Sequence, residues 1–168
     1  MAPEVNLGAS RSIWRRPTLV RLQRMSKQRL VESFDGYKLF CRFVPAKGPV
    51  THRLLLHHGL GEHSGRYETF LETLSEAGIE SIAFDMRGHG QNKVGPRGDA
   101  GGWRHQKEDL KAVFEAFKAL TPMVLMGQSM GGFNVLRYAL EAEAMVSGLI
   151  SLGNHKRSFQ EMTLSSRD

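Results

Sequence analysis

The sequence contains a single cysteine and no long apolar run, and each shortage excludes a class of protein. Cys41 is the only cysteine among 168 residues, which excludes an intrachain disulfide framework and a thiolate metal cluster. No segment approaches the roughly 18 consecutive apolar residues that a membrane-spanning helix requires. Cys41 lies in a strand-like segment, so we expect it to pack there as a small apolar side chain.

Acidic residues are nearly absent from the first 30 positions. Seven basic residues stand there against Glu4 alone, so this segment carries the whole net charge of +6. The rest of the chain balances 16 basic against 16 acidic residues. A nucleic-acid-binding domain would carry its basic surface on the folded part. We therefore expect no nucleic-acid partner.

Residues 1–28 form a basic N-terminal extension whose role the composition leaves open. It is rich in arginine and serine, as mitochondrial transit peptides are. A disordered extension, a translation start upstream of Met25, and an anchor for anionic lipid are the other interpretations. We expect a cytoplasmic or membrane-peripheral protein, with mitochondrial targeting as the alternative.

Beyond the extension, strand-like and helix-like segments alternate. Strand-like segments predict strands at 29–34, 38–43, 54–58, 79–84, 123–126 and 146–152, of which 54–58 and 123–126 are short buried apolar segments. Helical spacing predicts helices within 67–77, 110–117 and 133–140. Asp35-Gly36 predicts a hairpin turn between the first two strands. The alternation predicts an α/β core over 29–152, with a mainly parallel sheet and helices on both faces, followed by an atypical tail at 153–168.

The segment Gly127-Gln128-Ser129-Met130-Gly131 follows a predicted strand and opens a predicted helix. This is the context of the nucleophile elbow of α/β-hydrolases, whose serine lies at the crest of a sharp turn. The glycines two positions away are required because side chains there would collide. The segment thus predicts Ser129 as a catalytic nucleophile.

An acyl-transferring serine needs N–H donors for the oxyanion that develops on the substrate. Motif mechanics assign one donor to the residue after the nucleophile, here Met130. The second is expected from the loop His58-Gly59-Leu60-Gly61, after a predicted strand, with the Leu60 N–H as the best candidate. The flanking glycines, Gly59 and Gly61, are expected to let the backbone of this loop approach the substrate.

Three motifs together resemble a known family. They are the segments 57–67 (HHGLGEHSGRY), 85–90 (DMRGHG) and 127–132 (GQSMGG). In order and spacing they resemble monoacylglycerol lipases and related lysophospholipase-like enzymes, which are serine aminopeptidase S33-type hydrolases. The resemblance covers residues 29–152. It implies an α/β-hydrolase fold and hydrolysis of lipid-type carboxylic esters through Ser129, without a cofactor. It also implies that His58 and His89 brace loops rather than act as the catalytic base.

In this fold the acid and the histidine of the triad follow the serine along the chain. Only 39 residues follow Ser129, and they include His155, Glu161 and Asp168. The resemblance places the true acid and base beyond the sixth strand, so we do not expect His155 to be the base. The sequence is typical of an N-terminal half truncated after about that strand. The alternative function is therefore a catalytically incompetent isoform or pseudo-hydrolase that binds a ligand or a partner.

The same sequence bears on other partners and on one rival function. Besides the lipid ester, we expect two further partners. These are a membrane surface, through peripheral contact, and a second copy of the chain, through the edge of an incomplete sheet. The histidines lack metal-ligand spacing, so no metal site is predicted. Gly59 to Gly65, with Asp85 twenty residues on, is close to a dinucleotide-binding fingerprint. Glu62 would place a carboxylate where the pyrophosphate should lie, which argues against that function.

Overall fold

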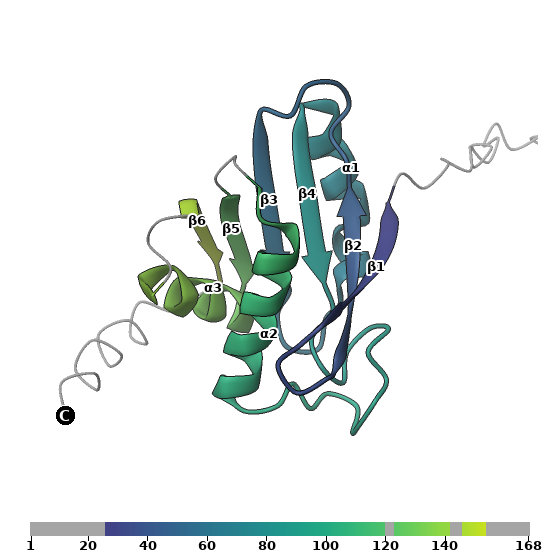
Figure 1. Cartoon of the computed structure of the whole chain (residues 1–168), viewed down its shortest axis with the longest axis vertical. Coiled ribbons are helices and arrows are strands. Elements are labelled where there is room, and N and C mark those ends of the chain that lie inside the picture. Colours follow the sequence, from purple (N-terminus) through teal and green to yellow (C-terminus); the bar gives the residue numbers. More distant parts are fainter. Residues whose placement is uncertain (1–25, 120–122, 142–145, 154–168) are drawn as a thin grey trace, which may run out of the picture.

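A computed structural model describes residues 26–119, 123–141 and 146–153, which form one sheet with helices on both faces (Figure 1). The strands are β1 (Lys27–Glu32), β2 (Lys38–Val44), β3 (His52–His57), β4 (Ile79–Phe84), β5 (Met123–Gln128) and β6 (Val146–Leu152). The helices are the 3-10 turn η1 (Ser64–Tyr67), α1 (Glu68–Glu76), α2 (Trp103–Phe117) and α3 (Met130–Glu141). Helix α2 begins seven residues before its predicted start, because these seven residues include a single apolar side chain and give no periodic signal.

The strands lie side by side in the order β1-β2-β4-β3-β5-β6. The last four of these pair in parallel, whereas β1 and β2 are antiparallel. His57 at the end of β3 lies opposite both Phe84 of β4 and Gly127 of β5, so the carboxyl ends of the three strands are level. The predicted mainly parallel sheet is confirmed, and its loops at this end can build a site.

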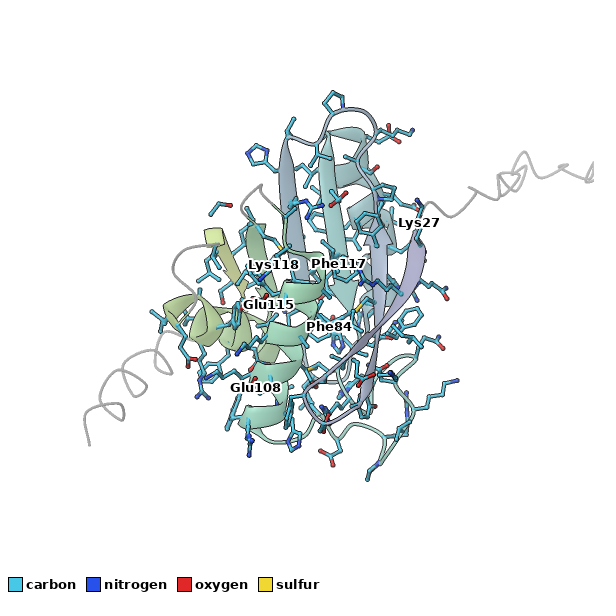
Figure 2. All side chains as sticks on the ribbon, in the orientation of Figure 1. Lys27, Phe84, Glu108, Glu115, Phe117 and Lys118 are labelled. Atoms are coloured by element: carbon cyan, nitrogen blue, oxygen red, sulfur yellow. The ribbon has the colours of Figure 1, made fainter. Side chains whose placement is uncertain are left out.

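The two faces of the sheet bury two apolar clusters. Leu55 packs with residues of α2 and α3 on one face, and its neighbours Leu54 and Leu56 pack with Leu71 of α1 on the other. Such double burial explains why β3 reads as a continuous apolar run. Figure 2 shows Phe84 of β4 between the sheet and α2, in the larger cluster.

The predicted hairpin joins β1 to β2. Gly36 adopts a φ of 82°, which favours glycine, and the Ser33 N–H donates to the Tyr37 carbonyl at 2.8 Å. Cys41 of β2 is fully buried, as expected, and burial raises the pKa of its thiol. Because the hairpin turn lies beyond the Phe84 end of β4, it shares the end of the sheet where β3, β4 and β5 terminate (Figure 1).

Strand β6 lies at one edge of the sheet and is uncharged along its seven residues. Its apolar side chains Leu149, Ile150 and Leu152 are 38–42% exposed. An uncharged apolar edge can pair with another strand, so the expected self-association stays a prediction for this strand. Among the helices that the structure describes, none is long and apolar enough to cross a membrane.

Candidate active site

The turn from β5 into α3 places Ser129 at its crest. Ser129 has a φ of 51° and is the only non-glycine residue with positive φ in the described part of the chain. Such a conformation costs an L-residue about 1–3 kcal/mol and persists only where the surroundings hold it. The side chain is exposed, and α3 starts at the next residue. The backbone is therefore strained so that it presents a hydroxyl at a helix amino terminus.

The glycines of this turn are required by close backbone contact. A Cβ built on Gly127 would lie 2.3 Å from the Gly131 carbonyl oxygen. One built on Gly131 would lie 2.2 Å from the carbonyl oxygen of His57, in β3. The collision that the sequence predicts is real, but for Gly131 the obstacle is the neighbouring strand rather than the elbow.

Two backbone hydrogen bonds hold the elbow. The Ser129 N–H donates to the Leu152 carbonyl at 2.7 Å, and the Phe133 N–H donates to the Ser129 carbonyl at 3.1 Å. The first bond ties the nucleophile to the end of β6, and the second continues α3. The anchor at Leu152 was not predicted, because nothing local in the sequence relates these positions.

The loop after β3 lies beside the nucleophile. A Cβ on Gly59 would lie 3.3 Å from Ser129 Cβ and 3.1 Å from the Gln128 carbonyl oxygen, so glycine permits this approach. The side chain of the next residue, Leu60, is 60% exposed, and its backbone belongs to the same turn as Gly59. The predicted loop and the predicted nucleophile are thus neighbours. The donor roles of the Leu60 and Met130 amides remain predictions.

Asp85, which directly follows β4, holds the segments on either side of it by hydrogen bonds. Its buried carboxylate accepts the Ser64 N–H at 2.6 Å and the Gln91 N–H at 2.8 Å. A Cβ on Gly90 would overlap this carboxylate, which explains the glycine there. Since both carboxylate oxygens are engaged inside the protein, Asp85 is not presented for ribose binding as the dinucleotide reading would require.

Three histidines brace the loops at this end. The His58 Nδ1–H donates to the Gly59 carbonyl at 2.7 Å, and His58 Nε2 accepts the Met86 N–H at 2.9 Å. His89 bonds in the same way to the Arg87 carbonyl and, at 3.3 Å, to the Gly61 N–H. With both ring nitrogens engaged, these imidazoles connect the Gly59–Gly61 loop to the loop after β4. The expectation that they hold loops agrees with these contacts.

His57 forms a third such brace, in a network that sequence reasoning missed. The Asn134 side-chain amide of α3 donates to His57 Nε2 at 3.2 Å and to Gln106 Oε1 of α2 at 2.8 Å. The Gln106 amide in turn donates to the Gly101 carbonyl. This buried chain fixes the nucleophile helix to β3 and α2. Asn134 and His57 are 77 residues apart in sequence, so no local pattern could indicate their contact.

Burial lowers the pKa of these imidazoles. Desolvation, followed by the neighbouring His58, lowers the pKa of His57 to about 3. Desolvation also lowers the pKa of His58 below its ordinary value. Both rings are therefore neutral in the folded protein at neutral pH, as their acceptor nitrogens require.

Acidification should destabilise the protein through these rings before its carboxylates protonate. The unfolded histidines bind protons as pH falls below about 6.5, whereas folded His57 does not until about 3. The His57 ring should thus lower the free energy of unfolding by up to about 1.4 kcal/mol per pH unit over that window, and the lowered pKa of His58 acts in the same direction. Urea unfolding between pH 7 and about pH 5 measures the slope, above the range where carboxylates protonate.

Substitution of His57 provides the control for this slope. We expect His57→Gln to show a shallower pH dependence, with His52→Gln, an exposed histidine of the same strand, unchanged. Equal slopes in wild type and His57→Gln would contradict the assignment of the effect to this ring.

A base for Ser129 is not found among the described residues. Within 26–119, 123–141 and 146–153 the Ser129 hydroxyl has no hydrogen-bond partner, and His57, His58 and His89 are engaged elsewhere. His155, Glu161 and Asp168 lie outside the described residues, so their predicted roles are not placed. Across the same described ranges, no group of three histidine, cysteine or acidic side chains could hold a metal ion.

A second cluster that the sequence did not reveal fixes the loop after β4. Arg87 donates to Asp109 of α2 through two bonds of 2.7 Å and to Asp35 of the hairpin at 2.6 and 2.8 Å. The Ser33 hydroxyl donates to Asp109 at 2.5 Å. Hydrogen bonds from Arg87 hold the pKa of the Asp35 carboxyl well below its usual range. Hairpin, loop and α2 are thus joined at the end of the sheet where Ser129 lies.

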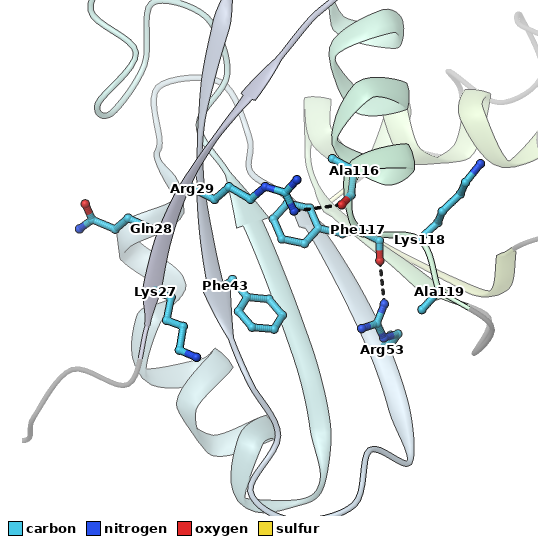
Figure 3. A pocket seen from close by; sticks show the side chains of 9 residues that line it. All are labelled: Lys27, Gln28, Arg29, Phe43, Arg53, Ala116, Phe117, Lys118 and Ala119. Carbon is cyan, nitrogen blue, oxygen red and sulfur yellow. Dashed lines mark hydrogen bonds between the residues drawn. The ribbon is translucent and has the colours of Figure 1, made fainter.

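A pocket of about 450 Å³ lies at the opposite end of the sheet. Figure 3 shows Arg29 and Arg53 there, donating to the carbonyls of Ala116 and Phe117 at the end of α2. Lys27 and Phe43 line it as well. Because the strands β3, β4 and β5 begin at this end, the pocket is remote from Ser129 and is not part of the candidate active site.

The sequence of this chain is similar to those of known hydrolases. The model of a family described as serine aminopeptidase S33 matches residues 48–157. The chain is 32% identical over 120 residues to a human monoglyceride lipase, covering 69% of this chain and 39% of that protein. It is 41% identical over 92 residues to a putative monoglyceride lipase of Schizosaccharomyces pombe, covering 52% of this chain and 24% of that protein.

Solved structures show the same fold. An open-form lipase aligns with a TM-score of 0.64 and 27% identity, over 74% of this chain and 43% of that one. A thermostable carboxyl esterase from Bacillus coagulans aligns with a TM-score of 0.64 and 25% identity, over 84% and 49%. The expected α/β-hydrolase fold is confirmed. The chain spans less than half the length of each of these four proteins.

Proposed function

Because the chain belongs to the serine aminopeptidase S33 family, we propose that it supplies the nucleophile and the oxyanion hole of a serine hydrolase acting on lipid-type carboxylic esters. The observation that carries the proposal is the exposed, strained Ser129 at the amino terminus of α3, with Gly59 of the neighbouring loop beside it. Identity to monoglyceride lipases favours a monoacylglycerol-like ester as substrate.

In the proposed reaction, Ser129 Oγ attacks the ester carbonyl carbon as a base removes its proton. The carbonyl oxygen becomes an oxyanion that the Leu60 and Met130 N–H groups stabilise. Collapse of this intermediate releases the alcohol and leaves the acyl group on Ser129, from which water then removes it. The base is not among the described residues, so the alternative is a chain that is not catalytic by itself and binds ligand or partner.

Labelling with a fluorophosphonate probe separates these two functions. We expect the folded 168-residue protein to react and Ser129→Ala to lose all labelling, since the probe requires an activated serine. Ser147→Ala, which removes an exposed hydroxyl of β6, is the matched control and should label as wild type. Folded protein that stays unlabelled would contradict an active nucleophile and favour the non-catalytic alternative.

A further inference from the structure

The end of the molecule that carries Ser129 also carries an exposed set of aromatic and cationic side chains. The set comprises Phe34 of the hairpin, Val94 of the loop after β4, and three helical residues, Trp103, Arg104 and Arg137. Phe34 and Trp103 are each 48% exposed and Val94 is 75% exposed. We call these five residues the aromatic–cationic band. The hairpin, the loop and the start of α2 lie together at the lower end in Figure 1.

Contacts between neighbouring elements connect the members of the band. The Tyr37 hydroxyl donates to the Val94 carbonyl at 3.2 Å, which places the loop against the hairpin. The Arg104 guanidinium lies 5.4 Å from the Phe34 ring, and that of Arg137 lies 5.6 Å from the Trp103 ring. Because Trp103 and Arg104 are neighbours at the start of α2, the band runs from the hairpin across the start of α2 to α3.

The band reaches the nucleophile through α3. The Trp103 ring packs on Phe133, with ring centroids 5.0 Å apart. Phe133 is one helical turn beyond Ser129 and donates its N–H to the Ser129 carbonyl. A surface that covered the band would thus lie beside the turn that carries Ser129.

The charge of the band favours an anionic partner. Among the residues that the structure describes, Arg104 and Arg137 form no ion pair, whereas nearby Arg87 and Lys107 do. Tryptophan and phenylalanine prefer the boundary between lipid headgroups and acyl chains, and arginine binds anionic headgroups. The turns and the start of α2 also protrude at this end. Such a shape suits a flat bilayer surface better than a peptide, which binds in a groove.

We propose that the aromatic–cationic band binds the surface of an anionic lipid bilayer, with Trp103 and Phe34 at the headgroup boundary and Arg104 and Arg137 on the phosphates. The partner fits the proposed function, because a lipid ester would then be presented beside Ser129. Binding itself needs no reaction at Ser129, so Ser129→Ala should bind vesicles as wild type does. Failure of the binding and failure of the catalysis are therefore separate results.

The test uses the full chain with Trp14→Phe, which leaves Trp103 as the only tryptophan. Vesicles of phosphatidylcholine with phosphatidylglycerol, containing brominated acyl chains, should quench Trp103 fluorescence, and pure phosphatidylcholine vesicles should quench it far less. Each basic residue near an anionic surface contributes about 1 kcal/mol, so loss of two should weaken binding roughly 30-fold. We expect Arg104→Glu/Arg137→Glu to show at least that loss.

The matched control reverses two charges at the pocket end of the sheet, with Lys27→Glu/Lys118→Glu. We expect its Trp103 quenching to equal that of the parent. Equal losses in both double variants would overturn the proposal, as would vesicle sedimentation without Trp103 quenching, which would assign binding to the basic N-terminal extension. Circular dichroism of each variant verifies that it is folded.

Discussion

Gly131→Ala should destabilise the protein by about 3 kcal/mol or more and abolish labelling of Ser129, although it adds only one methyl group. The added Cβ would lie 2.2 Å from the His57 carbonyl oxygen and 2.5 Å from that of His58. Both obstacles are backbone atoms at the end of β3, which cannot rotate away as a side chain can. Helix α3 must therefore move off the sheet, and Ser129 moves with it. Urea unfolding followed by circular dichroism measures the loss.

Gly148→Ala is the matched control for this substitution. Its Cβ would meet the Val124 side chain at 3.6 Å, an ordinary contact, on strand β6. We expect its unfolding free energy to change by less than about 0.5 kcal/mol. A Gly131→Ala protein with the stability of Gly148→Ala would show that the elbow is not packed as described. An insoluble Gly131→Ala beside a soluble Gly148→Ala supports the packing.

Arg87→Met should cost about 3–5 kcal/mol of unfolding free energy, because it leaves a buried carboxylate without its cation. The Asp109 side chain is 4% exposed, and Arg87 provides both of its charge-assisted bonds. After the substitution only the Ser33 hydroxyl remains to Asp109. The hairpin also loses its ion pair with the loop after β4, since Asp35 bonds to Arg87.

Two further variants identify the cause of that loss. Lys38→Met removes an exposed ion pair with Glu32, whose side chains are 57% and 60% exposed, and should cost less than about 1 kcal/mol. Arg87→Met/Asp109→Leu removes the stranded charge and should recover part of the stability lost in Arg87→Met. A double variant as unstable as the sum of its two single variants would show that stranded charge is not the cause.

The nucleophile turn could be predicted because its sequence pattern is local. The two glycines, Gly127 and Gly131, each stand two positions from Ser129, although the backbone that excludes a side chain at Gly131 belongs to β3. The strands β3 and β5 could be predicted equally well, since burial on both faces of the sheet leaves a continuous apolar run in each. In these elements the local sequence pattern and the tertiary packing require the same types of residue.

The supports of the site could not be predicted because they join distant segments. Ser33 and Asp109 are 76 residues apart and meet only after the hairpin has packed on α2. In the sequence Asn134 does not differ from the other polar residues of a helix, yet it is buried and donates a hydrogen bond to His57. The start of α2 at Trp103 was missed for a different reason, because Trp103 is the one apolar residue among the first seven of this helix, which therefore show no apolar period.

The order of the strands also determines when the sheet can close during synthesis. Strand β3 lies between β4 and β5, both of which follow it in the chain, and Leu55 pairs with Leu125, 70 residues later. At about 5–20 residues per second, a ribosome needs roughly 4–14 s to add that stretch. Throughout this time the run Leu54-Leu55-Leu56 lacks one of its two neighbours, so the nascent chain offers chaperones an apolar segment before the nucleophile has been translated.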